Sequence, residues 1–270
     1  MPVNMIAVDM DGTFLDDNKT YDRPRFLAQY QQLKARGIRF VVASGNQYYQ
    51  LISFFPEIAA EIAFVAENGA WVVDGTEDVF HAQLPAESAR KVLARLRDFP
   101  QLEIIVCGKK QAWTLRHYQP EFQAVAARYY HRLTLVDNFT SVDDTILKFA
   151  LNVSQQHQSQ THAQLCKAMD GLMTPVSSGH GSIDLIIPSV HKAHGLQLLQ
   201  QRWQISDAEI MAFGDSGNDL EMLRHAGFSF AMGNGVPAVK AAARYSAPDN
   251  NHHGVLAVID QLLHHQPPFN

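Results

Sequence analysis

Two aspartates near the N-terminus are two residues apart at the end of a predicted strand. Residues 5–8 are apolar and contain no turn residue, as is typical of a buried strand in a parallel sheet. Side chains of an extended chain alternate between faces, so Asp9 and Asp11 point the same way. Two like charges this close repel each other unless a cation binds them or one carries a proton. The pair therefore predicts a metal site or an acid–base pair, and the alternative is an ordinary Asx-type turn before Gly12.

A second acidic loop follows another predicted strand, much later in the chain. The strand is residues 209–213, and the loop that follows, residues 214–219, reads Gly-Asp-Ser-Gly-Asn-Asp. Asp215 and Asp219 therefore lie on either side of a glycine-containing turn that enters a helix. If this loop meets the first acidic pair in one crevice, the carboxylates require a cation. A site made only of oxygen ligands and rich in carboxylates suits Mg²⁺.

A divalent cation among acids attracts an anionic ligand such as a phosphate, and the sequence offers donors for one. Ser44 follows a predicted strand at the expected start of a helix, where its hydroxyl and the next N–H groups can bind an anion. Lys192 offers a point charge, and Asn218 and the backbone amides of Met10 and Asp11 offer further donors. Taken singly, Ser44 is more often a helix cap and Lys192 a solvated helix residue.

Strands and helices alternate through the first part of the chain. The expected strands are residues 5–8, 38–43 and 63–66, and the expected helices are residues 22–36 and 47–55. This β-α-β-α-β order predicts a doubly wound parallel sheet with right-handed crossovers, whose ligands bind at the carboxyl ends of the strands. Asp9, Ser44 and Asn68 all lie at such ends.

The alternation stops after a predicted hairpin at residues 70–81, and a different pattern follows. There we expect helices near residues 85–97, 120–130 and 155–164, and strands near 103–107, 112–118, 133–136, 147–153, 173–177 and 182–187. From residue 191 the first pattern resumes, with helices at 191–203, around 220–223, at 237–243 and 255–264, and strands at 209–213 and 228–232. The predicted architecture is a doubly wound α/β core, residues 1–83 and 188–270, with an inserted α+β cap domain, residues 84–187.

The composition argues against several classes of function. The chain has 270 residues and a net charge of −5 without a basic block, which argues against nucleic acid as its main partner. No apolar run is long enough to cross a bilayer, and no secretory signal is readable. Cys107 and Cys166 are the only cysteines, too few for a disulfide framework. We therefore expect a soluble, cytoplasmic protein that binds neither nucleic acid nor a membrane.

The motifs, in their order along the chain, resemble the four signature motifs of the haloacid dehalogenase superfamily. They are Asp9-Met10-Asp11-Gly12-Thr13, then Ser44, then Lys192, then residues 214–219. An insert between the second and third motifs, together with Glu67-Asn68-Gly69-Ala70, resembles the Cof-type branch of this superfamily, whose members have a Rossmann-like core and a large α/β cap. The resemblance covers almost the whole chain and implies a magnesium-dependent sugar phosphatase.

The resemblance also implies a role for each matching residue. Asp9 corresponds to the nucleophile that forms a phosphoaspartate, and Asp11 to the acid that protonates the leaving alcohol and then activates water. In the family, the metal is held by the carboxylates matching Asp9 and Asp215 and by the backbone carbonyl at Asp11, with Asp219 and Thr13 in support. The matching phosphate binders are Met10, Ser44, Gly45, Asn46, Lys192 and Asn218. Many relatives carry arginine where this chain has Asn46.

The insert supplies the candidates for substrate selection. Residues 178–181, Ser-Gly-His-Gly, separate two predicted strands and could fold over the crevice, or could be an ordinary hairpin loop. Gly179, His180 and Asp184 are the expected cap residues that contact substrate. The expected substrate is a small phosphorylated metabolite, a hexose or pentose phosphate, and the expected cofactor is Mg²⁺. The alternatives are a phosphotransferase or mutase that uses the same aspartate, and a phosphometabolite sensor without catalysis.

Overall fold

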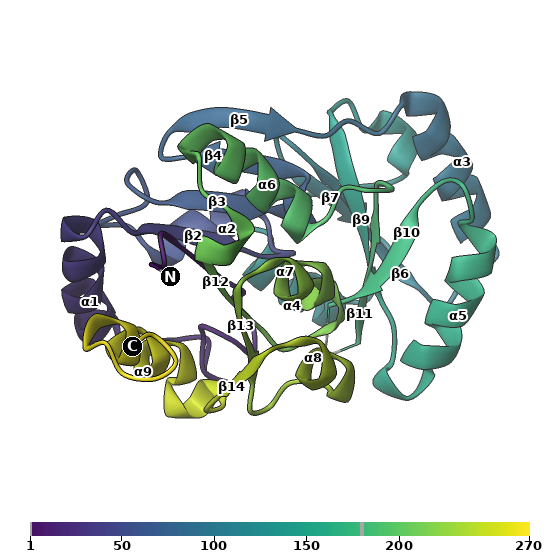
Figure 1. Ribbon diagram of the computed structural model, residues 1–270. Coiled ribbons are helices and arrows are strands. Elements are labelled where there is room, and N and C mark those ends of the chain that lie inside the picture. Colours follow the sequence, from purple (N-terminus) through teal and green to yellow (C-terminus); the bar gives the residue numbers. More distant parts are fainter. Residues whose placement is uncertain (1, 179–180) are drawn as a thin grey trace.

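The computed structural model describes residues 2–178 and 181–270 and arranges them around two β-sheets (Figure 1). The larger sheet has the order β14-β13-β12-β1-β2-β3-β4-β5. Its strands are β1 (Met5–Val8), β2 (Arg39–Ala43), β3 (Ala63–Ala66), β4 (Trp71–Asp74), β5 (Glu77–His81), β12 (Ile210–Gly214), β13 (Phe228–Met232) and β14 (Tyr245–Ala247). The pairs from β14 to β3 are parallel, whereas β4 and β5 pair antiparallel.

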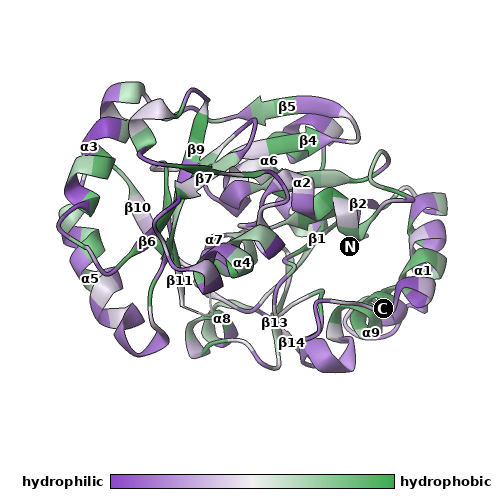
Figure 2. Ribbon diagram, turned by 180° about the vertical axis from the view of Figure 1, so that it is seen from behind, coloured by the Kyte–Doolittle hydropathy of each residue, from purple (hydrophilic) through white to green (hydrophobic). Residues whose placement is uncertain are grey.

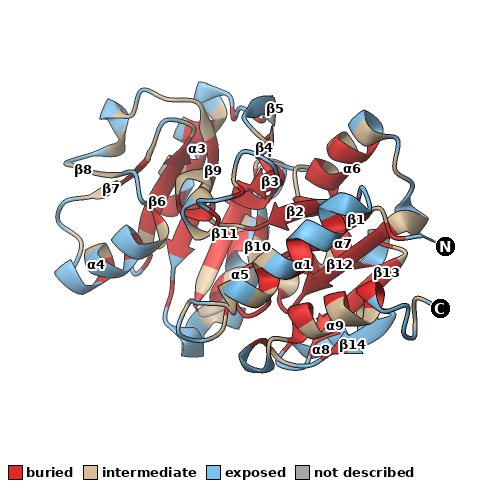
Figure 3. Cartoon of the chain, turned by 90° about the vertical axis from the view of Figure 1, so that its left-hand side faces the viewer, coloured by how far each residue is buried: buried red, intermediate tan, exposed pale blue. Residues whose placement is uncertain are grey.

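Helices cover both faces of the larger sheet. On one face α1 (Arg23–Ala35) packs beside α9 (Gly254–Leu263), and α2 (Tyr48–Leu51) contributes to the same apolar cluster. On the other face lie α6 (Lys192–Trp203), α7 (Leu220–His225) and α8 (Pro237–Ala242). Because both faces are covered, the strands β1, β3, β12 and β13 are buried along their whole length (Figure 3). In Figure 2 the strands are accordingly rich in apolar residues, whereas the helices mix polar and apolar ones.

The second sheet is formed entirely by strands between residues 103 and 186. Its order is β10-β11-β9-β6-β7-β8, with β6 (Glu103–Gly108), β7 (Ala112–Leu115), β8 (Leu133–Val136), β9 (Ile146–Asn152), β10 (Thr174–Ser177) and β11 (Ser182–Ile186). Helices α3 (Ala86–Leu96) and α5 (Gln158–Ala168) pack on one face, and α4 (Pro120–Tyr129) packs on the other. We call this sheet and its three helices the cap, and the larger sheet with its helices the core.

The order of the strands brings the predicted motifs together. Strand β1 lies between β2 and β12, with Val8 opposite both Val42 and Phe213. The chain leaves β1 in one direction toward β2 and reaches β12 on the other side, so a crevice opens at the carboxyl ends of these strands. The loops that carry Asp9, Ser44 and Asp215 begin at this edge.

The predicted fold class, a doubly wound α/β core with an α+β insert, is confirmed. Strand β14, which has only three residues and lies at the sheet edge, was not predicted. The helix predicted at residues 155–164 begins and ends later, because residues 155–157 form a 3₁₀ turn and α5 continues to Ala168. In the part of the chain that the structure describes, no helix is both long and apolar enough to span a bilayer.

Candidate active site

Lys192 joins the two acidic loops. It is the first residue of α6 and is completely buried, and its Nζ donates to Oδ1 of Asp9 and to Oδ1 of Asp219, at 2.6 Å each. Burial opposes the charged form of this lysine, but Asp219 and Asp9 outweigh it and hold its pKa above the usual value. Lys192 is thus a fixed positive charge beside Asp9, in contrast to the solvated helix residue that it would be in isolation.

Asp215 and Asp219 are held by the loop that follows β12. Oδ2 of Asp219 accepts from the backbone N–H groups of Asp215 and Ser216, at 2.9 and 3.0 Å. Oδ1 of Asp215 accepts from the Thr13 hydroxyl at 2.9 Å, which ties this loop to the loop after β1. Gly12 allows this approach, because its φ is +76° and a Cβ at this position would lie 2.6 Å from Oδ2 of Asp215.

The acidic residues fit a hard divalent cation. Asp9, Asp215 and Asp219 each offer one carboxylate oxygen, and these three atoms lie within 4.8 Å of one another. Burial, and then the neighbouring Asp219, raises the pKa of Asp215 to about 7, and burial raises that of Asp9 well above its usual value. Because both oxygens of Asp219 already accept from Lys192 and the backbone, Asp9 and Asp215 are the better candidates to ligate an ion. Their oxygens are the ligand type that Mg²⁺ prefers.

Asp11 lies in surroundings different from those of Asp9. It is half-buried, and it accepts from Nζ of Lys19 and from Nδ2 of Asn46, each at 2.6 Å. Asn46, which stands where many relatives carry arginine, thus contacts the carboxylate of Asp11, the residue expected to act as acid and base. Lys19 was not predicted, and its ammonium also lies 5.8 Å from the ring centroid of Tyr129 on the cap helix α4.

The turn after β2 lies between strand and helix, as predicted. Helix α2 begins at Tyr48, one residue after the predicted start, so the N–H groups directly after Ser44 are not part of a helix N-terminus. Backbone bonds pair this turn with the end of β3, since the Asn68 N–H bonds to the Ser44 carbonyl and the Glu67 N–H to the Asn46 carbonyl. The Ser44 hydroxyl accepts from the Asn46 N–H at 3.1 Å, which is a local turn bond and not a helix cap, because the N-cap residue of α2 is Gln47.

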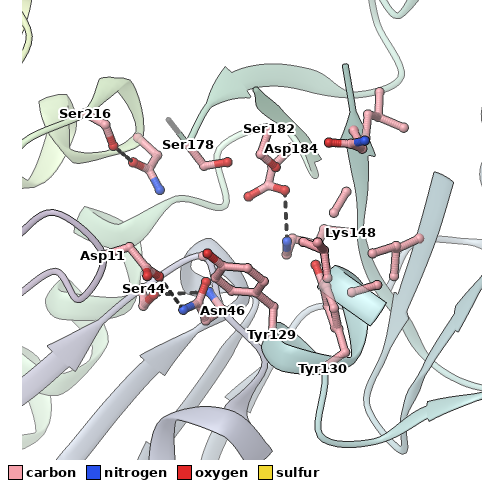
Figure 4. Close-up of a pocket in the computed structure, with 18 of the residues that line it drawn as sticks. Asp11, Ser44, Asn46, Tyr129, Tyr130, Lys148, Ser178, Ser182, Asp184 and Ser216 are labelled. Atoms are coloured by element: carbon pink, nitrogen blue, oxygen red, sulfur yellow. Dashed lines mark hydrogen bonds and ion pairs between the residues drawn. The ribbon is translucent and has the colours of Figure 1, made fainter. Parts of the chain in front are cut away.

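Polar side chains connect the core to the cap on the other side of the crevice. Asn68 donates from Nδ2 to Oδ2 of Asp184 at 2.6 Å, and its Oδ1 accepts from Nδ2 of Asn218 at 2.9 Å. Lys148, on β9, donates to Oδ1 of Asp184 at 3.0 Å. Figure 4 shows the Lys148–Asp184 pair across the cavity from Asp11, Ser44 and Asn46. Asp184 is therefore buried and fixed between the two sheets.

Glu67 and Lys148 form a second buried contact between core and cap. Nζ of Lys148 lies 3.4 Å from Oε2 of Glu67, and both side chains are 1% exposed. Burial raises the pKa of Glu67 to about 7, although Lys148 acts in the opposite direction. Burial also opposes the charge of Lys148, but Asp184 and its other neighbours hold the pKa of this lysine well above its usual value.

One cavity joins these groups, with a volume of about 190 Å³. Of the predicted site residues, its lining includes Asp9, Asp11, Ser44, Gly45, Asn46, Asn218 and Asp184. Four further predicted residues lie behind this lining, in contact with it or with one another: Thr13, Lys192, Asp215 and Asp219. The Met10 side chain is buried in the core cluster. Gly179 and His180 lie outside the described residues.

The geometry and the sequence agree with a known family. The model for haloacid dehalogenase-like hydrolases matches residues 6–259 of the chain. The chain belongs to this family. A curated relative from Escherichia coli (strain K12), named 5-amino-6-(5-phospho-D-ribitylamino)uracil phosphatase YbjI, is 58% identical over 270 residues, which are 100% of both chains. A relative of the same activity name from Bacillus subtilis (strain 168), YitU, is 27% identical, covering 96% of this chain and 97% of its own.

A solved structure has a similar fold over almost the whole chain. SMU.1108c from Streptococcus mutans UA159 is similar to this haloacid dehalogenase-like hydrolase with a TM-score of 0.93 and 36% identity, covering 97% of this chain and 99% of its own. The prediction of an enzyme that hydrolyses phosphoric monoesters agrees with the family and with the phosphatase names of both relatives.

Some residues of the site in this haloacid dehalogenase-like hydrolase were not predicted. Lys19 and Lys148 each contact a predicted aspartate, but neither stands in a motif or at the end of a core strand. Asn68 was placed at a strand end without a role, although its left-handed φ of +57° gives it a defined direction toward Asp184. A local signal for Asn68 exists, because asparagine followed by glycine is common where φ is positive.

Proposed function

We propose that the protein is a magnesium-dependent phosphatase that hydrolyses the phosphate esters of small sugars and sugar alcohols through a phosphoaspartate. The observation that carries the proposal is the different environment of two aspartates in one cavity. Asp9 lies buried against the Lys192 ammonium, whereas Asp11 is half-buried and bonded to Lys19 and Asn46. Such a division suits one carboxylate, Asp9, that Lys192 and a bound cation would hold ionised against the effect of burial, and one, Asp11, that exchanges a proton.

The proposed reaction has two steps. In the first, a carboxylate oxygen of Asp9 bonds to phosphorus while the bond from phosphorus to the ester oxygen breaks, and Asp11 gives its proton to the departing alcohol. In the second, Asp11 takes a proton from water, the water oxygen bonds to phosphorus, and the bond to Asp9 breaks to release phosphate. Both carboxylates return to their starting states, as a catalyst requires.

The remaining groups stabilise charge on the transferred phosphoryl group. Lys192 neutralises Asp9 during the approach of an anionic ester, and Asn218 and Ser44 lie in the same cavity as possible donors to phosphate oxygens. Magnesium, held by Asp9, Asp215 and the Asp11 carbonyl, would supply a positive charge beside the phosphate oxygens. Thr13 and Asp219 would keep Asp215 and Lys192 in position.

The polar part of the cap supports a polyhydroxyl leaving group. Opposite the acidic loops, the cavity is lined by polar cap side chains that offer both donors and acceptors for hydroxyl groups. They are Lys148, Asn152, Ser178, Ser182 and Asp184. The relative from E. coli is named for an ester in which the phosphate is on a ribityl group, which is a sugar alcohol. This name extends the expected class from hexose and pentose phosphates to pentitol phosphates.

A phosphate-release screen tests the proposal. Purified protein is incubated with hexose, pentose and pentitol phosphates, with Mg²⁺ or with a chelator, beside the Asp9→Asn variant. We expect free phosphate only with wild-type protein and Mg²⁺. Phosphate that stays on a sugar hydroxyl would instead indicate a phosphotransferase, and binding of the esters without turnover in Mg²⁺ would indicate a sensor. Release that persists in the chelator or in Asp9→Asn would overturn the proposed mechanism.

A further inference from the structure

Two buried glutamines join the segment after Ser44 to the cap. Gln47 is 1% exposed and Gln50 is 5% exposed, although glutamine side chains usually lie in water. Oε1 of Gln47 accepts from the Arg132 N–H and its Nε2 donates to the Arg132 carbonyl, at 2.9 Å each. Nε2 of Gln50 donates to the Arg128 carbonyl at 3.1 Å. Because Arg128 belongs to α4 and Arg132 directly precedes β8, all three bonds cross from the core to the cap.

The side chain of Gln47 is explained by this contact with the cap and not by the helix that follows it. Gln47 is the N-cap residue of α2, but its side chain makes no bond to that helix, and glutamine is not among the preferred capping residues. Its amide exchanges two bonds with the backbone of Arg132, as two paired residues of antiparallel strands do. The Arg132 carbonyl also accepts from the N–H of Ala112, on β7, at 2.8 Å. Gln47 is therefore bonded to the end of the cap sheet.

The residue directly before Gln47 holds Asp11. Asn46 donates from Nδ2 to Oδ2 of Asp11 at 2.6 Å, and Figure 4 shows this bond at one side of the cavity. The Asn46 carbonyl accepts from the Glu67 N–H at 3.1 Å. A single peptide bond thus separates the residue that contacts Asp11 from the residue that contacts the cap.

The other side-chain partner of Asp11 faces the same part of the cap. Lys19 donates to Oδ1 of Asp11 at 2.6 Å, and its ammonium lies 5.8 Å from the ring centroid of Tyr129, the last residue of α4. Residues 128–132 of the cap therefore contact Lys19 on one side and Gln47 on the other. The direction of the Asp11 carboxylate depends on how these residues lie on the core.

We propose that Gln47 is a positioning residue for Asp11 and acts through Asn46. The bonds to Arg132 fix the backbone of Gln47, and the adjacent Asn46 amide then holds the Asp11 carboxylate toward the leaving group. Gln47 does not line the cavity, so it acts on the steps in which Asp11 transfers a proton and not on the binding of the ester. This inference rests on the proposed function, because it assigns a proton transfer to Asp11.

The test measures how strongly the first step depends on the leaving group. Phenyl phosphate and p-nitrophenyl phosphate have almost the same shape, but phenolate needs a proton much more than p-nitrophenolate does. With the protein in excess over the ester and Mg²⁺ present, release of the phenol reports on the first step alone. In Gln47→Met, which keeps the length of the side chain but loses the amide, the rate should fall at least about tenfold more for phenyl phosphate than for p-nitrophenyl phosphate.

Gln29→Met is a matched control within the core. Gln29 is 3% exposed, and its Nε2 donates to the Leu256 carbonyl at 2.8 Å and to Oδ1 of Asp260 at 2.7 Å. This variant loses stability for the same reason as Gln47→Met, because both lose the bonds of a buried amide. We expect it to leave the ratio of the two rates unchanged. An equal change of this ratio in both variants would assign Gln47 a structural role only and overturn the inference.

A second variant, Gln47→Glu, provides the measurement if methionine prevents folding. A neutral carboxylic acid both accepts from the Arg132 N–H and donates to the Arg132 carbonyl, as the amide does, whereas a carboxylate has no proton to donate. Relative to wild type at the same pH, we expect a normal ratio of the two rates at about pH 5. As the pH rises to about 9, the rate for phenyl phosphate should fall further below wild type than the rate for p-nitrophenyl phosphate.

Failure of the inference and failure of the proposed function give different results. If wild type with Mg²⁺ releases a phenol from neither ester, the proposed function is overturned and the role of Gln47 with it. If wild type is active and the ratio of the two rates is unchanged in Gln47→Met, the inference alone is overturned. For Gln47→Glu, a ratio that stays equal to that of wild type at every pH has the same meaning.

Discussion

The side-chain amide of Asn68, on the core, bonds to Asp184, on the cap. Its Nδ2 donates to Oδ2 of Asp184 at 2.6 Å, and its Oδ1 accepts from Nδ2 of Asn218 at 2.9 Å. The Asn68 amide therefore contacts both Asp184, a candidate for binding sugar hydroxyl groups, and Asn218, a candidate donor to the phosphate. Asn68 thus joins the cap to the loop after β12 through a single side chain.

Replacement of Asn68 by glycine should reduce activity more than stability. Glycine adopts the φ of +57° without strain, so the change removes the amide and little else. A hydrogen bond to a charged group contributes about 1.5–3 kcal/mol, so we expect kcat/KM for sugar phosphates to fall by about 10- to 100-fold. The control is Gln204→Gly, an exposed position with a φ of +56° at the end of α6. Equal losses in both variants would contradict the role of Asn68.

The two aspartates should respond differently to amidation. Asp9→Asn removes the nucleophile, so turnover of every ester should fall by about 10³-fold or more. Asp11→Asn removes the acid and base, so turnover of alkyl phosphates should fall by about 10²- to 10⁴-fold. With p-nitrophenyl phosphate, whose phenolate leaves without a proton, Asp11→Asn should give a burst of nitrophenol and a phosphorylated protein detectable by mass spectrometry. A phosphorylated Asp9→Asn variant would contradict the assignment.

Gly12 should be required for metal affinity as well as for folding. Alanine at a φ of +76° costs about 1–2 kcal/mol, and its Cβ would lie 2.6 Å from Oδ2 of Asp215 and displace this carboxylate. Gly37 is a matched control, because its φ is +73° and a Cβ there meets no atom within 4 Å. We expect a larger loss of unfolding free energy in Gly12→Ala than in Gly37→Ala, because only Gly12→Ala displaces a buried carboxylate, and a higher Mg²⁺ requirement for activity only in Gly12→Ala. If the Mg²⁺ requirement for activity were unchanged in both variants, the ion would not bind at Asp215.

Glu67 should make the protein less stable as the pH rises. In the folded chain Glu67 keeps its proton until about pH 7, whereas its usual pKa is 4.5. Between these values the folded state binds more protons than the unfolded state, so this contribution is complete below pH 4.5 and is lost as the pH approaches 7. Glu67→Gln has no such proton, so its unfolding free energy relative to wild type should rise by up to about 3 kcal/mol from pH 5 to pH 8. Parallel denaturation profiles for the two proteins would contradict the buried, raised pKa.

The sequence by itself determined the core and the position of its acidic loops. Parallel strands buried on both faces read as short apolar runs, and β1, β2, β3 and β12 are of this kind. Because the chain alternates between strands and helices, every such run ends at the same edge of the sheet. The residues that follow these runs, Asp9, Ser44 and Asp215, therefore had to lie near one another, whatever the details of their contacts.

The tertiary structure decided which other residues complete the site. Lys19, Lys148 and Tyr129 lie in segments without a motif. The loop after β1 folds Lys19 onto Asp11, the pairing of β9 with β11 places Lys148 beside Asp184, and the packing of the cap on the core brings Tyr129 to Lys19. The apolar pattern of α4 could not show which of its residues the cap uses for packing and which it leaves to the cavity. The physical reason is that local sequence sets strands, helices and turns, whereas burial and pairing across two sheets depend on contacts between distant parts of the chain.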